Sequence, residues 1–227
     1  MSITITTPGT SRFGQFAARA EVVQRVDLSP NTALIRLAVP PSLGHFQAGD
    51  KVKFAVPGGH PRSYTPARLG GGALDIVFEL HGRGPTASWA ARAQPGDVAW
   101  TTGALPSLRV PAGRLWFIGD ATTLGLAVAL HEDPRHDLAG VVELDAPDEL
   151  AVARLMLPLA VVEKGRASQV PPADAEIAVI AGEAGLVSDA HRAMGAARVP
   201  RICTRPYWSL RGKAHRKRVA ATTGGVR

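Results

Sequence analysis

The sequence predicts an N-terminal antiparallel β-barrel followed by a small α/β domain with a parallel sheet, because the pattern of apolar residues changes near residue 110. Before that point, short runs rich in Val, Ile, Leu and Phe recur about every ten to twelve residues between turn-forming residues, which is typical of a barrel or sandwich. After it, continuous apolar runs alternate with helix-like segments, as in a parallel sheet buried on both faces. We expect domains over 1–110 and 111–212 and a disordered basic tail over 213–227.

In the first half, each expected strand is an apolar run that ends at Gly, Pro, Asn or Asp. These strands are expected over residues 21–28, 32–39, 50–56, 62–69, 73–82 and 97–105. One short helix is expected within 84–97, where Ala and Trp recur at helical spacing before Pro95 and Gly96.

In the second half, strands and helices are expected to alternate. The strands are expected over 114–120, 138–144, 158–164, 176–183 and 200–205, and the helices over 122–132, 147–156 and 185–195. Residues 165–175 contain two prolines and are expected to form a loop. No G-x-G-x-x-G follows the first of these strands, so the ordinary dinucleotide-binding fingerprint is absent.

Cysteine usage and hydropathy limit the chemistry and the location. Cys203 is the only cysteine, so an internal disulfide and a Cys/His metal cluster are excluded, and redox chemistry would need a dissociable organic cofactor. A cytoplasmic location is the expectation, since no apolar run reaches about 18 residues and the N-terminus lacks a secretory pattern. We favour a monomer without a membrane span.

The net charge of +7 would attract either nucleic acid or small anions. Part of the excess lies in residues 211–218, which we interpret as a solvated tail. Because no nucleic-acid module accompanies this tail, we expect no nucleic-acid partner. A binder that uses the tail to hold nucleic acid is the weaker alternative.

The stretch "RSYT" is the first candidate site. On a strand, Arg62 and Tyr64 would share one face, with Ser63 and Thr65 on the other. Arginine offers a planar set of donors for phosphate, and tyrosine offers a stacking face with a polar tip. A ligand with a phosphate and a flat ring system would fit these residue types. The alternative is a cross-strand Arg–Tyr pair on an exposed sheet face.

The stretch "HGRGPTAS" lies about twenty residues downstream and combines glycines with the start of a helix. Glycine lets the backbone approach a ligand closely, and free amides at a helix N-terminus attract anions. A pyrophosphate could lie here with its other end at "RSYT"; a plain capped helix is the alternative. The candidate residues are His81, Gly82, Gly84, Pro85, Thr86, Ala87 and Ser88.

Two further turns follow strands of the second half, where ligands bind in open α/β sheets. The candidates are Gly119, Asp120, Thr122 and Thr123 in the first turn, and Gly182 and Glu183 in the second. Ordinary glycine turns are the alternative. Tyr207 and Trp208 are expected after the last strand, either as a wall near a cofactor ring or as an aromatic plug on the core.

Taken in order, "RSYTPA", "LHGRGPTASWA", "PGDVAW", "FIGDATTLGLA", "IAGEAGLV" and "RPYW" resemble the siderophore-interacting protein family over residues 16–212. These flavin-dependent ferric-siderophore reductases belong to the ferredoxin–NADP reductase-like superfamily. The resemblance implies a barrel that binds FAD and an α/β domain that binds NADPH or NADH. It places Arg62, Tyr64, Thr65 and the "HGRGPTAS" residues at the flavin, and the two downstream turns at the nucleotide donor.

The family resemblance also implies that electrons pass from the donor through FAD to an Fe(III) chelate, which releases Fe(II). No catalytic acid, base or nucleophile is then expected, because the flavin carries the electrons. Candidate contacts to an anionic ferric siderophore are Lys51, Lys53, Arg205 and Arg211, with ordinary solvated charges as the alternative.

The sequence also departs from the family pattern. Ala121 stands where the family often has glutamate, Ser209 where it usually has arginine, and "TGALPSL" where a Gly-Pro-x-Gly turn is common. Two other functions therefore stay open. One is a general flavin or ferredoxin-type reductase, and the other is a flavin- and siderophore-binding protein without nicotinamide-dependent activity.

Overall fold

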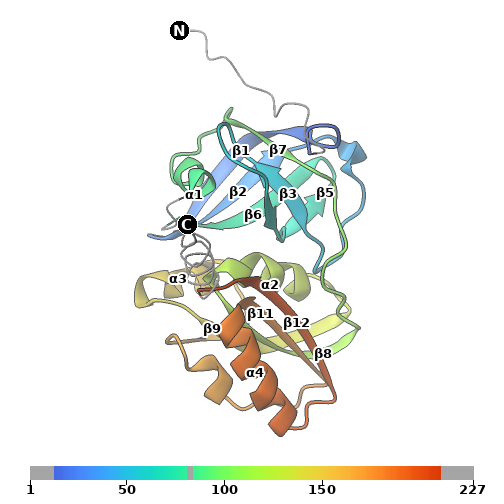
Figure 1. The fold of residues 1–227 in the computed structure, drawn as a ribbon, viewed down its shortest axis with the longest axis vertical. Helices are drawn as coiled ribbons and strands as arrows, with labels where there is room; N and C mark the ends of the chain where they lie inside the picture. Colours follow the sequence, from blue (N-terminus) through green and yellow to red (C-terminus); the bar gives the residue numbers. More distant parts are fainter. Residues whose placement is uncertain (1–12, 81–83, 211–227) are drawn as a thin grey trace, which may run out of the picture.

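The computed structural model describes residues 13–80 and 84–210. They form two sheets placed one above the other, with helices at the junction between them (Figure 1). The first sheet is antiparallel and the second parallel, and the chain passes between them once, after residue 101. The predicted fold class is confirmed.

The first sheet has seven strands in the order β4-β3-β7-β1-β2-β6-β5. Alternate residues of these strands point into one apolar core, including Ile35, Phe54 and Phe78. Helix α1 (Pro85–Ala90) joins this core through Trp89, whose ring centroid lies 5.7 Å from that of Phe54. The strands are β1 (Ala18–Ser29), β2 (Thr32–Ala38), β3 (Val52–Ala55), β4 (Arg62–Tyr64), β5 (Arg68–Gly70), β6 (Ala73–Glu79) and β7 (Val98–Thr101).

One strand prediction in this half is wrong. Residues 62–69 do not form a single strand but two, β4 and β5, which lie at opposite edges of the sheet. Pro66 explains the break, because proline has no N–H for a sheet ladder. The chain from Tyr64 to Arg68 spans at most about 14 Å. The two edges must therefore approach each other, and the sheet curls into a barrel (Figure 1).

The second sheet has five parallel strands in the order β10-β9-β8-β11-β12. The chain begins in the centre at β8 and moves outward on one side and then on the other, so the order reverses between β8 and β11. In open α/β sheets, ligands bind beyond the carboxyl ends of the strands at such a point. The strands are β8 (Gly113–Asp120), β9 (His136–Glu143), β10 (Leu159–Val162), β11 (Ile177–Glu183) and β12 (Arg201–Trp208).

Helices cover both faces of the second sheet. Helix α2 (Leu124–His131) packs on the face that carries Phe117 and Val179, and α4 (Ala184–Ala196) on the face that carries Ile118 and Ile180. Residues 124–130 of α2 are all buried, as expected for a helix enclosed between two sheets (Figure 1). The smaller helices are η1 (Pro41–Leu43), η2 (Ala121–Thr123), η3 (Ala146–Asp148), α3 (Glu149–Arg154) and η4 (Ala167–Gln169).

Two details of the second half differ from the prediction. Strand β12 continues to Trp208, so Tyr207 and Trp208 lie within the strand and not after it. The segment expected to be a loop contains the short helix η4, whose Ala167 is buried and donates its N–H to Glu143. No helix within the described part of the chain is long and apolar enough to cross a membrane.

The two sheets meet along a seam with an apolar centre. Leu28 of the first sheet and Ala67, in the link between β4 and β5, belong to the same buried cluster as Leu124 and Leu126 of α2. The approach is closest at Gly125, where an added Cβ would lie 2.6 Å from the carbonyl oxygen of Thr65. Only glycine allows the backbones to come this near.

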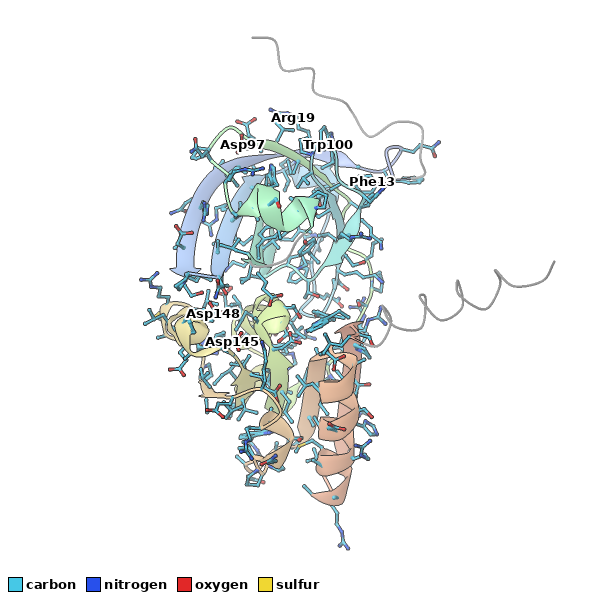
Figure 2. All side chains as sticks on the ribbon, turned by 60° about the vertical axis from the view of Figure 1, so that its left-hand side comes forward. Phe13, Arg19, Asp97, Trp100, Asp145 and Asp148 are labelled. Carbon is cyan, nitrogen blue, oxygen red and sulfur yellow. The ribbon has the colours of Figure 1, made fainter. Side chains whose placement is uncertain are left out.

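Hydrogen bonds and an ion pair lie on either side of this apolar centre. The buried Asp148 accepts hydrogen bonds from the Ser29 hydroxyl and, at 3.3 Å, from Asn31 Nδ2. Figure 2 shows Asp148 at the junction of the sheets, far from Trp100 at the other end of the barrel. Arg68 of β5 forms an ion pair with Glu132 at the end of α2, where both side chains are partly exposed.

We expect the buried hydrogen bonds of Asp148 to contribute more to the free energy of unfolding than the exposed Arg68–Glu132 ion pair. Asp148→Ala leaves the donors of Ser29 and Asn31 without their acceptor and should lower the free energy of unfolding by about 2 kcal/mol. Glu132→Ala is the control and should cost about 1 kcal/mol or less, because exposed ion pairs contribute little. Urea unfolding followed by tryptophan fluorescence measures both. Equal losses would contradict this account of the seam.

Candidate functional site

A cavity of about 810 Å³ opens where the barrel meets the carboxyl edge of the second sheet. Its walls come from both sheets, from the start of α1 and from the end of β12. A cavity of this size suits one cofactor-sized ligand. The lining residues are Lys51, His60, Arg62, Ser63, Tyr64, Thr65, Val77, Glu79, Gly84, Pro85, Thr86, Ala87, Ser107, Thr122, Arg205, Pro206, Tyr207 and Trp208.

All four residues of "RSYT" line this cavity. The Tyr64 ring packs edge-on against Phe54, with centroids 5.9 Å apart, so the barrel core fixes its position. Burial raises the pKa of Tyr64, although a side-chain hydrogen bond with Thr86 opposes the rise. The Arg62 side chain is exposed, and its guanidinium makes no hydrogen bond or ion pair with another described residue, which leaves its donors free. Ser63 accepts a hydrogen bond of 2.8 Å from Lys53 Nζ.

The start of α1 lies beside "RSYT". Gly84, Pro85, Thr86 and Ala87 line the cavity, whereas Ser88 does not. Gly84 precedes the helix, and no side chain of the described residues caps the first amides. His81 and Gly82, which were also predicted for this turn, lie outside the described residues.

The first turn of the second sheet is organised around Asp120, which is buried. Asp120 Oδ1 accepts hydrogen bonds from the Thr122 N–H at 2.9 Å and the Thr122 hydroxyl at 2.5 Å. Asp120 Oδ2 accepts from Glu183 N–H at 2.7 Å and Trp208 Nε1 at 3.1 Å. The carboxylate therefore joins the ends of β8, β11 and β12, and both of its oxygens are committed to the protein.

The second turn is closed in the same way. Glu183 caps α4, because Oε2 accepts from the N–H groups of Gly185 and Leu186, and Oε1 accepts from Leu210 N–H at 3.1 Å. Burial alone would raise the pKa of Glu183, but these backbone donors hold it below its ordinary value. The N-terminus of α4, which could otherwise attract an anionic ligand, is thus already occupied by the Glu183 carboxylate.

The predicted nucleotide residues separate into two groups. Thr122, Tyr207 and Trp208 line the cavity. The others do not line it but lie at the carboxyl ends of β8 and β11 or in η2: Gly119, Asp120, Thr123, Gly182 and Glu183. Gly182, for example, has φ +117, and an added Cβ would lie 2.5 Å from Asp120 Oδ2. Contact of either group with a donor nucleotide stays a prediction.

The end of β12 closes one side of the cavity. Tyr207 lies with its hydroxyl oxygen 2.6 Å from Thr65 Oγ1, and burial raises the pKa of Tyr207 to about 12. Trp208 remains 42% exposed and is held through its indole N–H by Asp120. The barrel and the second sheet therefore meet directly at this cavity wall.

Two of the four predicted substrate residues line the cavity, and a third lies near one of them. Lys51 and Arg205 line it, and Lys53 lies close enough to act on Lys51 electrostatically. Burial, followed by the positive charges of Arg205 and Lys53, lowers the pKa of Lys51. Arg211 lies outside the described residues. The group forms a basic wall suited to an anion.

Sequence reasoning missed several lining residues, among them His60, Ser107 and Glu79. His60 and Ser107 lie in irregular segments, where no periodicity indicates which way a side chain points. Val77 and Glu79 share one face of β6, and the alternation of side chains along a strand could have predicted this. Nothing in the sequence pattern, however, indicates that this face of the strand lines a cavity.

Comparison with known proteins finds a family match in the first half of the chain. Residues 30–104 match the family described as "Siderophore-interacting FAD-binding domain". No curated protein matches the chain.

Three solved structures illustrate the similarity in fold. The siderophore-interacting protein SipS from Aeromonas hydrophila has 23% identity and a TM-score of 0.66, over 92% of this chain and 98% of its own. A siderophore utilization protein from T. fusca has 20% identity and a TM-score of 0.63, over 86% and 93%. A ferredoxin NADP+ reductase from Neisseria gonorrhoeae, with bound FAD and NADP, has 15% identity and a TM-score of 0.68, over 85% and 99%.

The matched segment runs from the first hairpin of the barrel through α1 and β7, so it contains "RSYT" and the described start of α1. The remaining strands complete the same two-sheet architecture as in these structures. Residues 30–104 therefore match a siderophore-interacting FAD-binding domain, and the chain has the fold of siderophore-interacting proteins and of a ferredoxin NADP+ reductase.

Proposed function

We propose that this protein is an oxidoreductase that uses FAD to pass electrons from NADPH or NADH to a ferric siderophore, which releases iron as Fe(II). One observation carries the proposal. A single cavity brings together the "RSYT" strand, the start of α1, the last strand of the second sheet and a basic wall. In this proposal residues 1–110 hold the flavin and residues 111–212 receive the donor.

The residues at the cavity fit a flavin nucleotide. Arg62 offers unpaired donors to a pyrophosphate, and the amides that follow Gly84 lie nearby. Tyr64 offers an aromatic surface whose position is fixed by Phe54, and Thr65 and Thr86 add hydroxyls. FAD, when bound, supplies the capacity to take a hydride and release electrons singly. The protein supplies binding, orientation and charge.

The donor would reach this cavity past Thr122 and Trp208, which lie at its second-sheet side. Asp120 and Glu183 act behind them by holding the strand ends in place. Because their carboxylates already occupy the η2 and α4 N-termini, we propose that they shape the donor site and do not themselves bind phosphate.

The basic wall fits an anionic ferric chelate. Lys51, Lys53 and Arg205 concentrate positive charge at the cavity, and we propose Arg211 as a further contact. The iron arrives in the chelate and is the substrate. Charge at a cleft attracts an oppositely charged ligand and raises its local concentration.

One alternative is favoured by a specific observation. The self-capped turns at Asp120 and Glu183, together with Ala121, reduce the groups available to a nicotinamide nucleotide. A protein that binds flavin and siderophore without nicotinamide-dependent activity would show the same barrel and the same basic wall.

The donor reaction distinguishes these functions. Purified protein loaded with FAD should lose its oxidised-flavin absorbance at about 450 nm when NADPH or NADH is added without oxygen. A ferric chelate should then restore the absorbance as Fe(II) forms. If neither nucleotide changes the spectrum, the protein is a binder and not a reductase. If the protein takes up no FAD, both functions are wrong.

The flavin site is tested at Arg62. Arg62→Ala should raise the Kd for FAD about tenfold or more, since hydrogen bonds between charged groups contribute about 1.5–3 kcal/mol. The unfolding free energy of the FAD-free protein should change by less than about 0.5 kcal/mol, because Arg62 is exposed. Arg192→Ala, on the outer side of α4, is the matched control. An unchanged Kd in Arg62→Ala would exclude this arginine from the site.

The basic wall is tested with two ferric chelates. Lys51→Gln and Arg205→Gln should each raise KM about three- to tenfold for a negatively charged chelate, and less for a neutral one. Because the pKa of Lys51 is lowered, its attraction should fade at a lower pH than for an ordinary lysine. Steady-state rates of Fe(II) formation measure KM, with Arg192→Gln as control. Equal changes for both chelates would contradict a role based on charge.

A further inference from the structure

Thr65 is held on two sides by the second sheet and its helix. Its hydroxyl oxygen lies 2.6 Å from the Tyr207 hydroxyl of β12. Its carbonyl oxygen faces Gly125 of α2 at a distance that leaves no room for a side chain. Pro66 and Ala67, which follow, are buried in the seam. The last residue of the flavin-binding motif is thus positioned by residues about 60 and 140 positions away in the sequence.

The direction of the Thr65–Tyr207 hydrogen bond follows from the two hydroxyls. A phenol is the stronger acid and the better donor, whereas an aliphatic hydroxyl is the better acceptor. Burial raises the pKa of Tyr207, so this phenol keeps its proton at any physiological pH. The distance alone allows either direction, and this difference in acidity favours Tyr207 as the donor and Thr65 Oγ1 as the acceptor. The hydrogen of Thr65 is then left to point elsewhere, and Thr65 lines the cavity.

We propose that Tyr207 is a positioning residue for the flavin site: it fixes the Thr65 hydroxyl so that Thr65 presents a hydrogen-bond donor to the ligand in the cavity. This inference rests on the proposed flavin site. It gives Tyr207 a different task from the predicted contact with a nucleotide donor. It also makes the last strand of the second sheet a part of the site that holds FAD.

The geometry also predicts coupling between the two residues. If Tyr207 acts only by orienting Thr65, removing either hydroxyl removes the same interaction with the ligand. The two substitutions should then not add, because residues that act as one unit give non-additive effects. A merely structural tyrosine would weaken folding and would show no such coupling in FAD binding.

The experiment is a double-mutant cycle in the full chain, read out as the Kd for FAD by quenching of flavin fluorescence. Tyr207→Phe and Thr65→Val should each raise the Kd about three- to tenfold, as expected for one hydrogen bond. The double variant should have the same Kd for FAD as the single variant that binds FAD less tightly. Thr65→Ser keeps the hydroxyl and should restore binding. The absorption bands of bound flavin should shift in Tyr207→Phe, since its hydrogen bonding changes.

Thr101→Val is the matched control, because it removes a buried hydroxyl that bonds the Thr102 carbonyl oxygen within the barrel. Its Kd for FAD should stay within about twofold of the unaltered protein. An unchanged Kd in Tyr207→Phe, or effects of Tyr207→Phe and Thr65→Val that multiply, would overturn this inference alone. Failure of the unaltered protein to bind FAD would overturn both the inference and the proposed function.

Discussion

The close approach of α2 to the backbone of Thr65, at Gly125, is the constraint on which the rest of the structure depends. It brings the curled antiparallel sheet against the parallel sheet and buries Ala67 among the leucines of α2. A side chain at position 125 would push the two halves apart, because its Cβ would meet a backbone oxygen and not a flexible side chain. The cavity, the Tyr207 contact and the basic wall all lie along the contact that this glycine permits.

Asp120 has a comparable role within the second sheet. Its carboxylate accepts hydrogen bonds from three separate segments, and a buried charge is tolerated only when such donors surround it. Without it, the indole of Trp208 and the N–H of Glu183 would lose their common acceptor. Asp120 thus holds the edge of the cavity in place without lining the cavity itself.

Much of this arrangement could be predicted from the sequence. Apolar periodicity located the strands of both sheets, and the change near residue 110 separated the antiparallel part from the parallel part. "RSYT" and the described start of α1 do line one cavity. The split of residues 62–69 into β4 and β5 was missed, although Pro66 was a local sign of it.

Other features depend on contacts between distant residues and have no local signal. Nothing near "RPYW" shows that the Tyr207 hydroxyl meets Thr65, or that the strand continues through Trp208. Acidic residues after Gly119 and Gly182 have the same sequence pattern whether they bind a ligand or cap a helix. Only the hydrogen bonds show that Asp120 and Glu183 are committed internally.

The capping of α4 by Glu183 has a consequence for how the protein meets charged ligands in solution. A helix N-terminus keeps its pull on anions only while it is bare, and this one is neutralised from within. Attraction at the cavity then depends on cationic side chains such as Lys51 and Arg205, and the field of exposed charges fades within about 8 Å at physiological ionic strength. The rate at which an anion associates with the cavity should therefore fall as ionic strength rises.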